Sequence, residues 1–112
     1  MNVRGQVLLW VAQRASAAVL ALCVIVHLVT MIYAVRHGLS AAEILGRTRG
    51  NYAWFAFYAT FVGAVAIHAP IGARTILAET LGLRGVLVDV VVLVLGLVLA
   101  LWGWRAVLAV FG

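Results

Sequence analysis

The chain has 112 residues, of which 67% are hydrophobic and only 10% are charged, and its net charge is +5. An ordinary soluble domain carries about 25% charged residues, so this chain lacks the polar side chains to cover a surface in contact with water. The composition excludes a soluble enzyme, and the abundance of apolar residues excludes a disordered chain. At about 20 residues per membrane span, the length allows three or four spans and no additional soluble domain.

Three apolar runs are long enough to cross a bilayer as helices, the form that satisfies its own backbone hydrogen bonds in lipid. They cover about residues 15–35, 53–73 and 86–110. A shorter apolar stretch at 7–12 precedes the first run and either lies in the interface or extends that helix. We expect an all-α membrane protein, with one transmembrane domain over residues 1–112 and three helices in an up-down-up bundle.

The connection between the first two spans covers residues 36–51 and is rich in Gly and Arg. Within it, Ser40 and Glu43 have the spacing of a capping box, in which a hydroxyl and a carboxylate satisfy the first backbone N–H groups of a helix. The sequence therefore predicts a short interfacial helix between the first two transmembrane helices.

All eight basic residues are arginines, and they lie at the ends of the apolar runs. This distribution is typical of membrane-boundary anchors rather than of a nucleic-acid site. One side of the membrane receives Arg4, Arg14, Arg74 and Arg84, and the other receives Arg36, Arg47, Arg49 and Arg105. Positive charge usually accumulates on the cytoplasmic side of a membrane protein. Because each side here receives four arginines, this rule does not decide the orientation.

Few polar residues lie inside the spans. Burying an ionisable group at that depth costs free energy, so such a group is treated as a candidate functional residue. A polar stripe on the first span has members spaced by three or four residues, which places them on one helical face. The polar stripe consists of Ser16, Leu20, Cys23, His27 and Thr30. We expect this stripe to face another helix.

His68 in the second span has small residues, Ala64 and Gly72, one turn away on either side. Small residues there permit either the approach of a bulky flat group or close helix packing. A neutral imidazole is a common axial ligand of haem iron, and a low dielectric favours the neutral form. A proton relay and a hydrogen bond between helices are the competing roles.

The depths of the two histidines constrain a haem site. Counting from the same side of the membrane, His27 lies about 14 Å deep and His68 about 22 Å deep. An offset of about 8 Å is hard to reconcile with two ligands on opposite faces of one haem. Either the two histidines serve different haems, each completed by another chain, or only one of them is a ligand.

Two segments resemble the cytochrome b membrane anchors of succinate dehydrogenase and fumarate reductase. The run His68-Ala-Pro-Ile-Gly72-Ala-Arg74-Thr-Ile-Leu-Ala-Glu79 is similar to the family signature H-x-x-x-G-x-R-x-x-x-x-D/E. The run Gln13-Arg14-Ala15-Ser16 resembles the H-R-x-S element at the start of the family's first helix, with glutamine in place of the histidine. The loop at 39–46 is also similar, and Trp10 stands where some members have a serine that contacts quinone.

The resemblance implies a set of cofactors and functional residues. It makes His68 an axial ligand of haem b, and it places Arg14 and Arg74 near the haem propionates and a quinone headgroup, either ubiquinone or menaquinone. It places Ser16 in the same pocket, and His27 has a counterpart among members that hold two haems. The direction of electron flow, the number of haems and the role of His27 stay open.

The resemblance also implies partners and a location. The chain would be one subunit of an oxidoreductase complex, beside a flavoprotein, an iron–sulfur subunit and a second small anchor or a second copy of itself. The family's topology places it in the bacterial inner membrane with a cytoplasmic N-terminus. The alternative is a small membrane subunit without a redox role, or a component of a transporter. Another b-type anchor, as in formate dehydrogenase or hydrogenase, normally has four or more spans.

Two further residues have a structural interpretation beside a functional one. Asp89 lies close to the expected start of the third span, where an acid suits the positive end of the helix dipole. Pro70 removes one backbone hydrogen bond in the second span and either shapes a cofactor pocket or accommodates packing.

Overall fold

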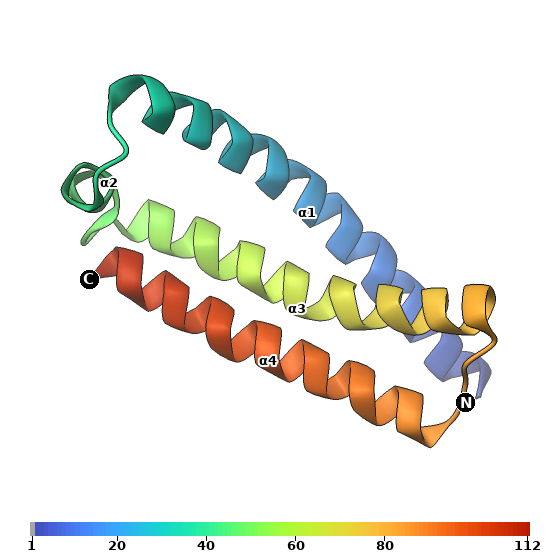
Figure 1. Ribbon diagram of the computed structural model, residues 1–112. Helices are drawn as coiled ribbons and strands as arrows, with labels where there is room; N and C mark the ends of the chain where they lie inside the picture. Colours follow the sequence, from blue (N-terminus) through green and yellow to red (C-terminus); the bar gives the residue numbers. More distant parts are fainter. Residues whose placement is uncertain (1) are drawn as a thin grey trace.

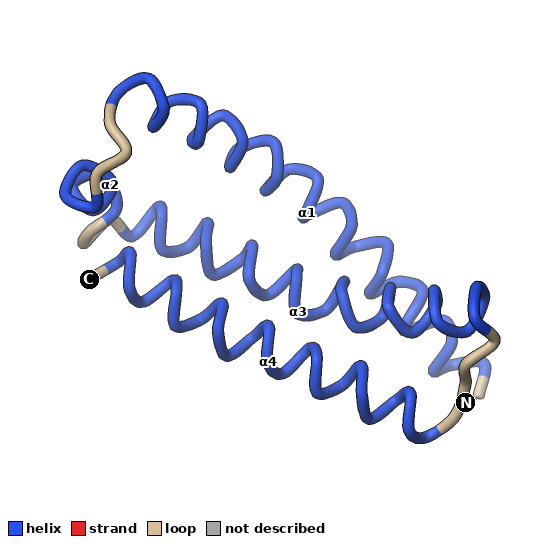
Figure 2. Tube along the Cα trace, viewed as in Figure 1, coloured by secondary structure: helices blue, strands red, loops and turns tan. Residues whose placement is uncertain are grey.

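The computed structural model describes residues 2–112, which form four helices and no strand. The helices are α1 (Val3–His37), α2 (Ala41–Thr48), α3 (Tyr52–Leu81) and α4 (Val86–Phe111). Figures 1 and 2 show the three long helices running in alternating directions, with the C-terminus beside α2 and the N-terminus near the α3–α4 connection. This arrangement confirms the predicted all-α bundle with a short helix between its first two long helices.

The three long helices have the length and hydrophobicity of membrane spans. They contain 35, 30 and 26 residues, so that even the shortest is about 39 Å long, which exceeds the roughly 30 Å of the bilayer's hydrocarbon core. These features indicate a multi-pass membrane protein. The apolar stretch at 7–12 belongs to α1, which therefore begins earlier than the predicted span, and α3 continues eight residues beyond its predicted end.

The short helix α2 begins where the capping pattern predicts. The Ser40 hydroxyl accepts a hydrogen bond from the Glu43 backbone N–H at 3.2 Å. At the other end of α2, the Thr48 hydroxyl donates to the Val110 carbonyl at 2.8 Å, and the Gly50 N–H donates to the Phe111 carbonyl at 2.8 Å. These bonds attach α2 to the C-terminal end of α4, so that α4 sets the position of α2.

Helix α3 is the central helix, because it packs against both α1 and α4. On the α4 side the two backbones approach closely through glycine. A Cβ atom added at Gly96 would lie 3.0 Å from Pro70 Cγ and 3.3 Å from the Ala66 carbonyl oxygen. Pro70 lies inside α3, which continues past it to Leu81. The proline therefore forms part of the α3–α4 contact.

We expect Gly96→Val to destabilise the bundle by about 1–3 kcal/mol, because the neighbouring proline ring and backbone cannot rotate away from the added side chain. Gly63→Val is the matched control, since a Cβ atom at Gly63 meets no other atom within 4 Å. Thermal unfolding of the two variants in the same detergent measures the difference. Equal transition temperatures would contradict the assigned role of Gly96.

Candidate cofactor site

The predicted stripe on α1 faces the interior of the bundle. Ser16 and Cys23 are the two buried residues of α1, with 5% of the surface of each exposed. The other members of the stripe, Leu20, His27 and Thr30, are half-buried, whereas most of α1 is exposed. The spacing of these residues therefore predicted the packed face of the helix correctly.

Ser16 and His68 meet across the contact between α1 and α3. The Ser16 hydroxyl oxygen lies 3.3 Å from His68 Nδ1 and 3.1 Å from the Gln13 carbonyl oxygen, to which it donates. A hydroxyl has a single proton, so with that proton on the Gln13 carbonyl the oxygen accepts from His68, and we infer from this arrangement that Nδ1 carries the imidazole proton. The other ring nitrogen, Nε2, is then left with a free lone pair, the form in which histidine binds a metal ion.

The small residues beside His68 are used for helix packing. Ala64 is 7% exposed, and a Cβ atom added at Gly72 would lie 3.3 Å from the side-chain nitrogen of Gln13. The sequence left open whether these small residues admit a bulky flat group or allow close helix packing. The structure shows close packing at both positions. The Gln13 side-chain oxygen is fully buried and makes no hydrogen bond within residues 2–112.

The two predicted arginines have separate partners. The guanidinium group of Arg74 donates through Nε to Asp89 Oδ1 at 2.7 Å, which links α3 to α4. The guanidinium carbon of Arg14 lies 5.3 Å from the centre of the Trp10 ring on α1 itself. Asp89 does lie in the first turn of α4, as an acid at a helix start should, but its pairing with Arg74 was not predicted. Only the packing of α3 against α4 brings these two side chains together.

His27 lies far from His68 along the bundle. Its ring makes edge-to-face contacts with Tyr58 and Phe61, at centroid distances of 5.8 and 5.5 Å. Eleven residues separate Ser16 from His27 on α1, and seven separate Phe61 from His68 on α3. The two histidines are therefore offset by about 10–16 Å. This offset exceeds the 8 Å predicted from the sequence. That prediction assumed that the C-terminal end of the first span and the N-terminal end of the second span lie at the same depth in the membrane.

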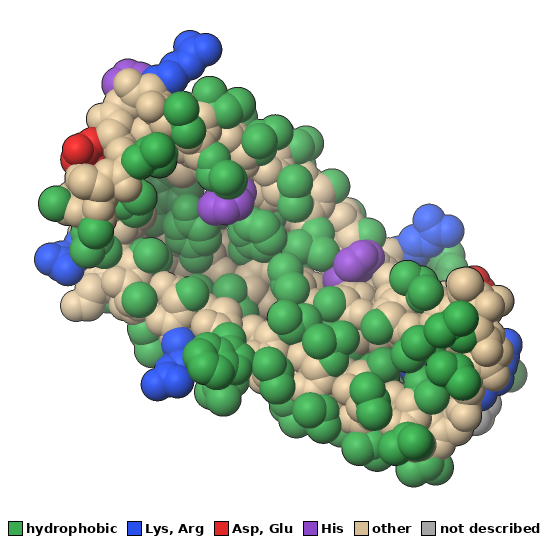
Figure 3. Space-filling view, viewed as in Figure 1, with side chains coloured by type: hydrophobic (Ala, Val, Ile, Leu, Met, Phe, Trp, Pro, Cys, Tyr) green, Lys and Arg blue, Asp and Glu red, His purple; other side chains and the backbone are tan. Residues whose placement is uncertain are grey.

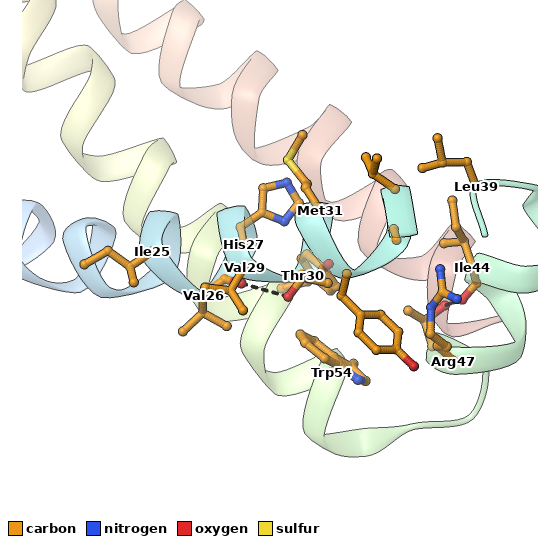
Figure 4. Close-up of a pocket in the computed structure, with 15 residues that line it drawn as sticks. Ile25, Val26, His27, Val29, Thr30, Met31, Leu39, Ile44, Arg47 and Trp54 are labelled. Carbon is orange, nitrogen blue, oxygen red and sulfur yellow. Dashed lines mark hydrogen bonds between the residues drawn. The ribbon is translucent and has the colours of Figure 1, made fainter. Parts of the chain in front are cut away.

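His27 lines a cavity of about 860 Å³ where α1, α2 and α3 meet. Figure 1 shows α1 diverging from α3 toward α2, and Figure 3 shows the surface hollowed between them. In Figure 4, His27 comes from α1, Arg47 from α2 and Trp54 from α3. The lining is otherwise mostly aliphatic and aromatic: Ile25, Val26, Val29, Thr30, Met31, Tyr33, Ala34, Val35, Leu39, Ile44, Thr48 and Tyr58.

Sequence analysis missed the contribution of α2 and α3 to this cavity. Trp54 lines the cavity together with Tyr58, one turn further along α3. Arg47 was assigned only to the membrane boundary; one of its guanidinium nitrogens donates to the Gly38 carbonyl oxygen at 2.9 Å. The spacing of Trp54 and Tyr58 was the available signal, because residues four apart share a helix face.

No group of three or more His, Cys, Asp or Glu side chains is placed to hold a metal ion within residues 2–112. Searches against known protein families, curated proteins and solved structures find no match to this chain. The chemistry of the site therefore has to be inferred from the hydrogen bonds and cavity described above.

We expect His68 to carry its proton on Nδ1 and Ser16→Ala to release this preference, at a cost of about 0.5–1.5 kcal/mol in stability. Nuclear magnetic resonance of protein labelled with ¹⁵N-histidine distinguishes the protonated from the unprotonated ring nitrogen. Ser16→Thr is the matched control, since it keeps the hydroxyl. A mixture of both tautomers in the wild-type protein would contradict the assignment.

Proposed function

We propose that this chain is the membrane-anchor subunit of a succinate dehydrogenase or fumarate reductase complex. In this role it holds haem b through His68 and forms part of the site where quinone exchanges electrons with the iron–sulfur subunit. The resemblance of residues 68–79 and 13–16 to this family motivates the proposal. The observation that carries it is the 3.3 Å contact between His68 Nδ1 and the Ser16 hydroxyl, which with Nδ1 as the donor leaves Nε2 unprotonated inside an apolar bundle.

The residues around His68 fit an iron ligand. Metal-bound histidines usually donate their second ring N–H to a neighbouring oxygen, which fixes the ring and makes the ligating nitrogen more basic. Here the Ser16 hydroxyl oxygen would accept from the His68 N–H, and the Gln13 carbonyl oxygen, to which the hydroxyl donates, holds the hydroxyl in turn. His68 is half-buried at the junction of α1 and α3. A bound haem b would supply one-electron transfer at this position.

The proposed quinone wall lies at the end of the bundle that holds the N-terminus and the α3–α4 connection (Figure 1). Arg14 and Arg74 both belong to this end. The ion pair with Asp89 is made through Nε of Arg74, so the terminal nitrogens of the guanidinium group can donate to a quinone carbonyl or a propionate. Asp89 then acts by fixing the direction of the Arg74 side chain.

Partners and location follow from the same proposal. The family topology places the Arg14–Arg74 end in the cytoplasm of a bacterium, beside the iron–sulfur subunit, which a flavoprotein supplies with electrons. His27 lies too far from His68 to bind the opposite face of the same haem. A haem held by His68 would take any further protein ligand from a second small anchor or a second copy of this chain. We assign the haem to His68 alone.

We expect the complex purified through a tag on this chain to contain b-type haem, and His68→Ala to remove most of it, because no other imidazole approaches that position. The reduced-minus-oxidised absorption spectrum measures the haem directly. His37→Ala is the matched control, since His37 is exposed at the end of α1. An unaltered spectrum in His68→Ala would refute the ligand. A wild-type complex with neither haem nor flavoprotein would favour the alternative of a small membrane subunit without a redox role.

We expect Arg74→Ala to lower succinate–quinone turnover at least tenfold while haem content falls much less, because the arginine acts on the quinone rather than on the iron. Asp89→Asn keeps an oxygen acceptor for Arg74 and should have a smaller effect. Turnover and haem content measured on the same membranes separate the two functions. Wild-type turnover in Arg74→Ala would show that the arginine is only a membrane anchor.

A further inference from the structure

A groove of about 550 Å³ runs along the contact between α3 and α4. On α4 its lining residues recur every three or four positions from Asp89 to Ala100, which places them on one face of the helix. Helix α3 lines the other side between Ala66 and Arg74. The lining residues Leu93 and Leu97 are 60% and 61% exposed. This α3–α4 groove is therefore open to the surrounding lipid.

The polar groups of the groove lie together at one end. Among its lining residues within 2–112, only Arg74 and Asp89 are polar, and they form the ion pair between Nε and Oδ1 at 2.7 Å. Their side chains are 40% and 52% exposed. The two terminal guanidinium nitrogens and the second carboxylate oxygen are left for other partners. The mouth of the groove thus offers a hydrogen-bond donor of positive charge beside an acceptor of negative charge.

The ion pair lies at the level of the lipid headgroups. Arg74 is 22 residues from Tyr52 at the start of α3, and Asp89 is 22 residues from Phe111 at the end of α4. Each separation corresponds to about 33 Å of helix, close to the roughly 30 Å thickness of the hydrocarbon core. With the opposite helix ends at one boundary of the core, the ion pair reaches the other boundary.

The length of the groove matches one leaflet of the bilayer. From Asp89 to Ala100 it follows eleven residues of α4, which is about 16 Å, whereas half of the hydrocarbon core is about 15 Å. A transmembrane helix of a partner would extend along the whole core. An acyl chain that descends from a headgroup at the ion pair ends where the groove ends. The groove therefore fits a lipid chain better than a partner helix.

We infer that the α3–α4 groove is a binding site for phosphatidylethanolamine. Its phosphate accepts hydrogen bonds from the terminal nitrogens of Arg74, a pairing that suits guanidinium geometry, and its primary ammonium group donates to the free oxygen of Asp89. One acyl chain lies in the groove. The charges of the headgroup and of the ion pair are then arranged in opposite order, so that each charge meets its complement.

Other occupants complement only part of the mouth. Phosphatidylglycerol has the phosphate but no cation for Asp89, and the quaternary ammonium of phosphatidylcholine has no N–H to donate. A quinone offers carbonyl acceptors to Arg74 alone. The guanidinium group keeps four N–H donors after the bond to Asp89, enough for a phosphate and for the quinone carbonyl of the proposed function. The lipid site itself requires neither haem nor quinone.

The test is native mass spectrometry of the protein purified in mild detergent with all partners that remain bound. Palmitoyl-oleoyl phosphatidylethanolamine is titrated against the phosphatidylglycerol and phosphatidylcholine with the same acyl chains. We expect the first to bind at least fivefold more tightly than either of the others. Asp89→Asn should abolish this preference, and Ala100→Phe, which fills the inner end of the groove, should weaken binding at least tenfold. The matched controls Glu79→Gln and Ala106→Phe, exposed and outside the groove, should change neither.

Equal affinity for the three lipids, or an undiminished preference in Asp89→Asn, would overturn the inference. Displacement of the bound lipid by decylubiquinone would also overturn it, by assigning the groove to quinone. The lipid comparison and Asp89→Asn decide the matter if Ala100→Phe does not fold. The preference in a preparation without haem or partner subunits would refute the proposed function and retain the lipid site, whereas haem without the preference would do the reverse.

Discussion

Lipid offers no hydrogen bond to a polar group, so each polar side chain inside this bundle must find its partner on a neighbouring helix or on its own backbone. Most do so. Thr30 and Thr60 donate to carbonyl oxygens one turn back on their own helices. Ser16 links α1 to His68 on α3, and Arg74 links α3 to Asp89 on α4. Within residues 2–112, the two fully buried side-chain atoms without a hydrogen-bond partner belong to Gln13 and His27.

Helix α3 contacts its two neighbours by different means, and this difference creates the cavity. Against α4 it uses glycine, which allows the two backbones to approach along the contact at Gly96 and Gly103. Against α1 it uses polar residues near Ser16 and then aromatic rings near His27. The larger rings lie where the helices separate toward α2, which bonds from Thr48 and Gly50 attach to α4 and a bond from Arg47 attaches to Gly38 at the end of α1.

The two histidines of the bundle interior have different surroundings. Nδ1 of His68 has the Ser16 hydroxyl as a partner, whereas Nδ1 of His27 is fully buried and has no partner within residues 2–112. Aromatic rings of Tyr58 and Phe61 surround His27 instead.

The sequence by itself determined the fold class, because apolar runs of this length can form only helices in lipid. It also determined the inward face of α1, through the spacing of Ser16 and Cys23, and the start of α2, through Ser40. These features depend on residues close together in the chain. Only the tertiary structure decided the pairs Ser16–His68 and Arg74–Asp89 and the space beside His27. Such contacts depend on the relative heights and tilts of the helices, which arise from side-chain packing between distant segments and leave no periodic signal in the sequence.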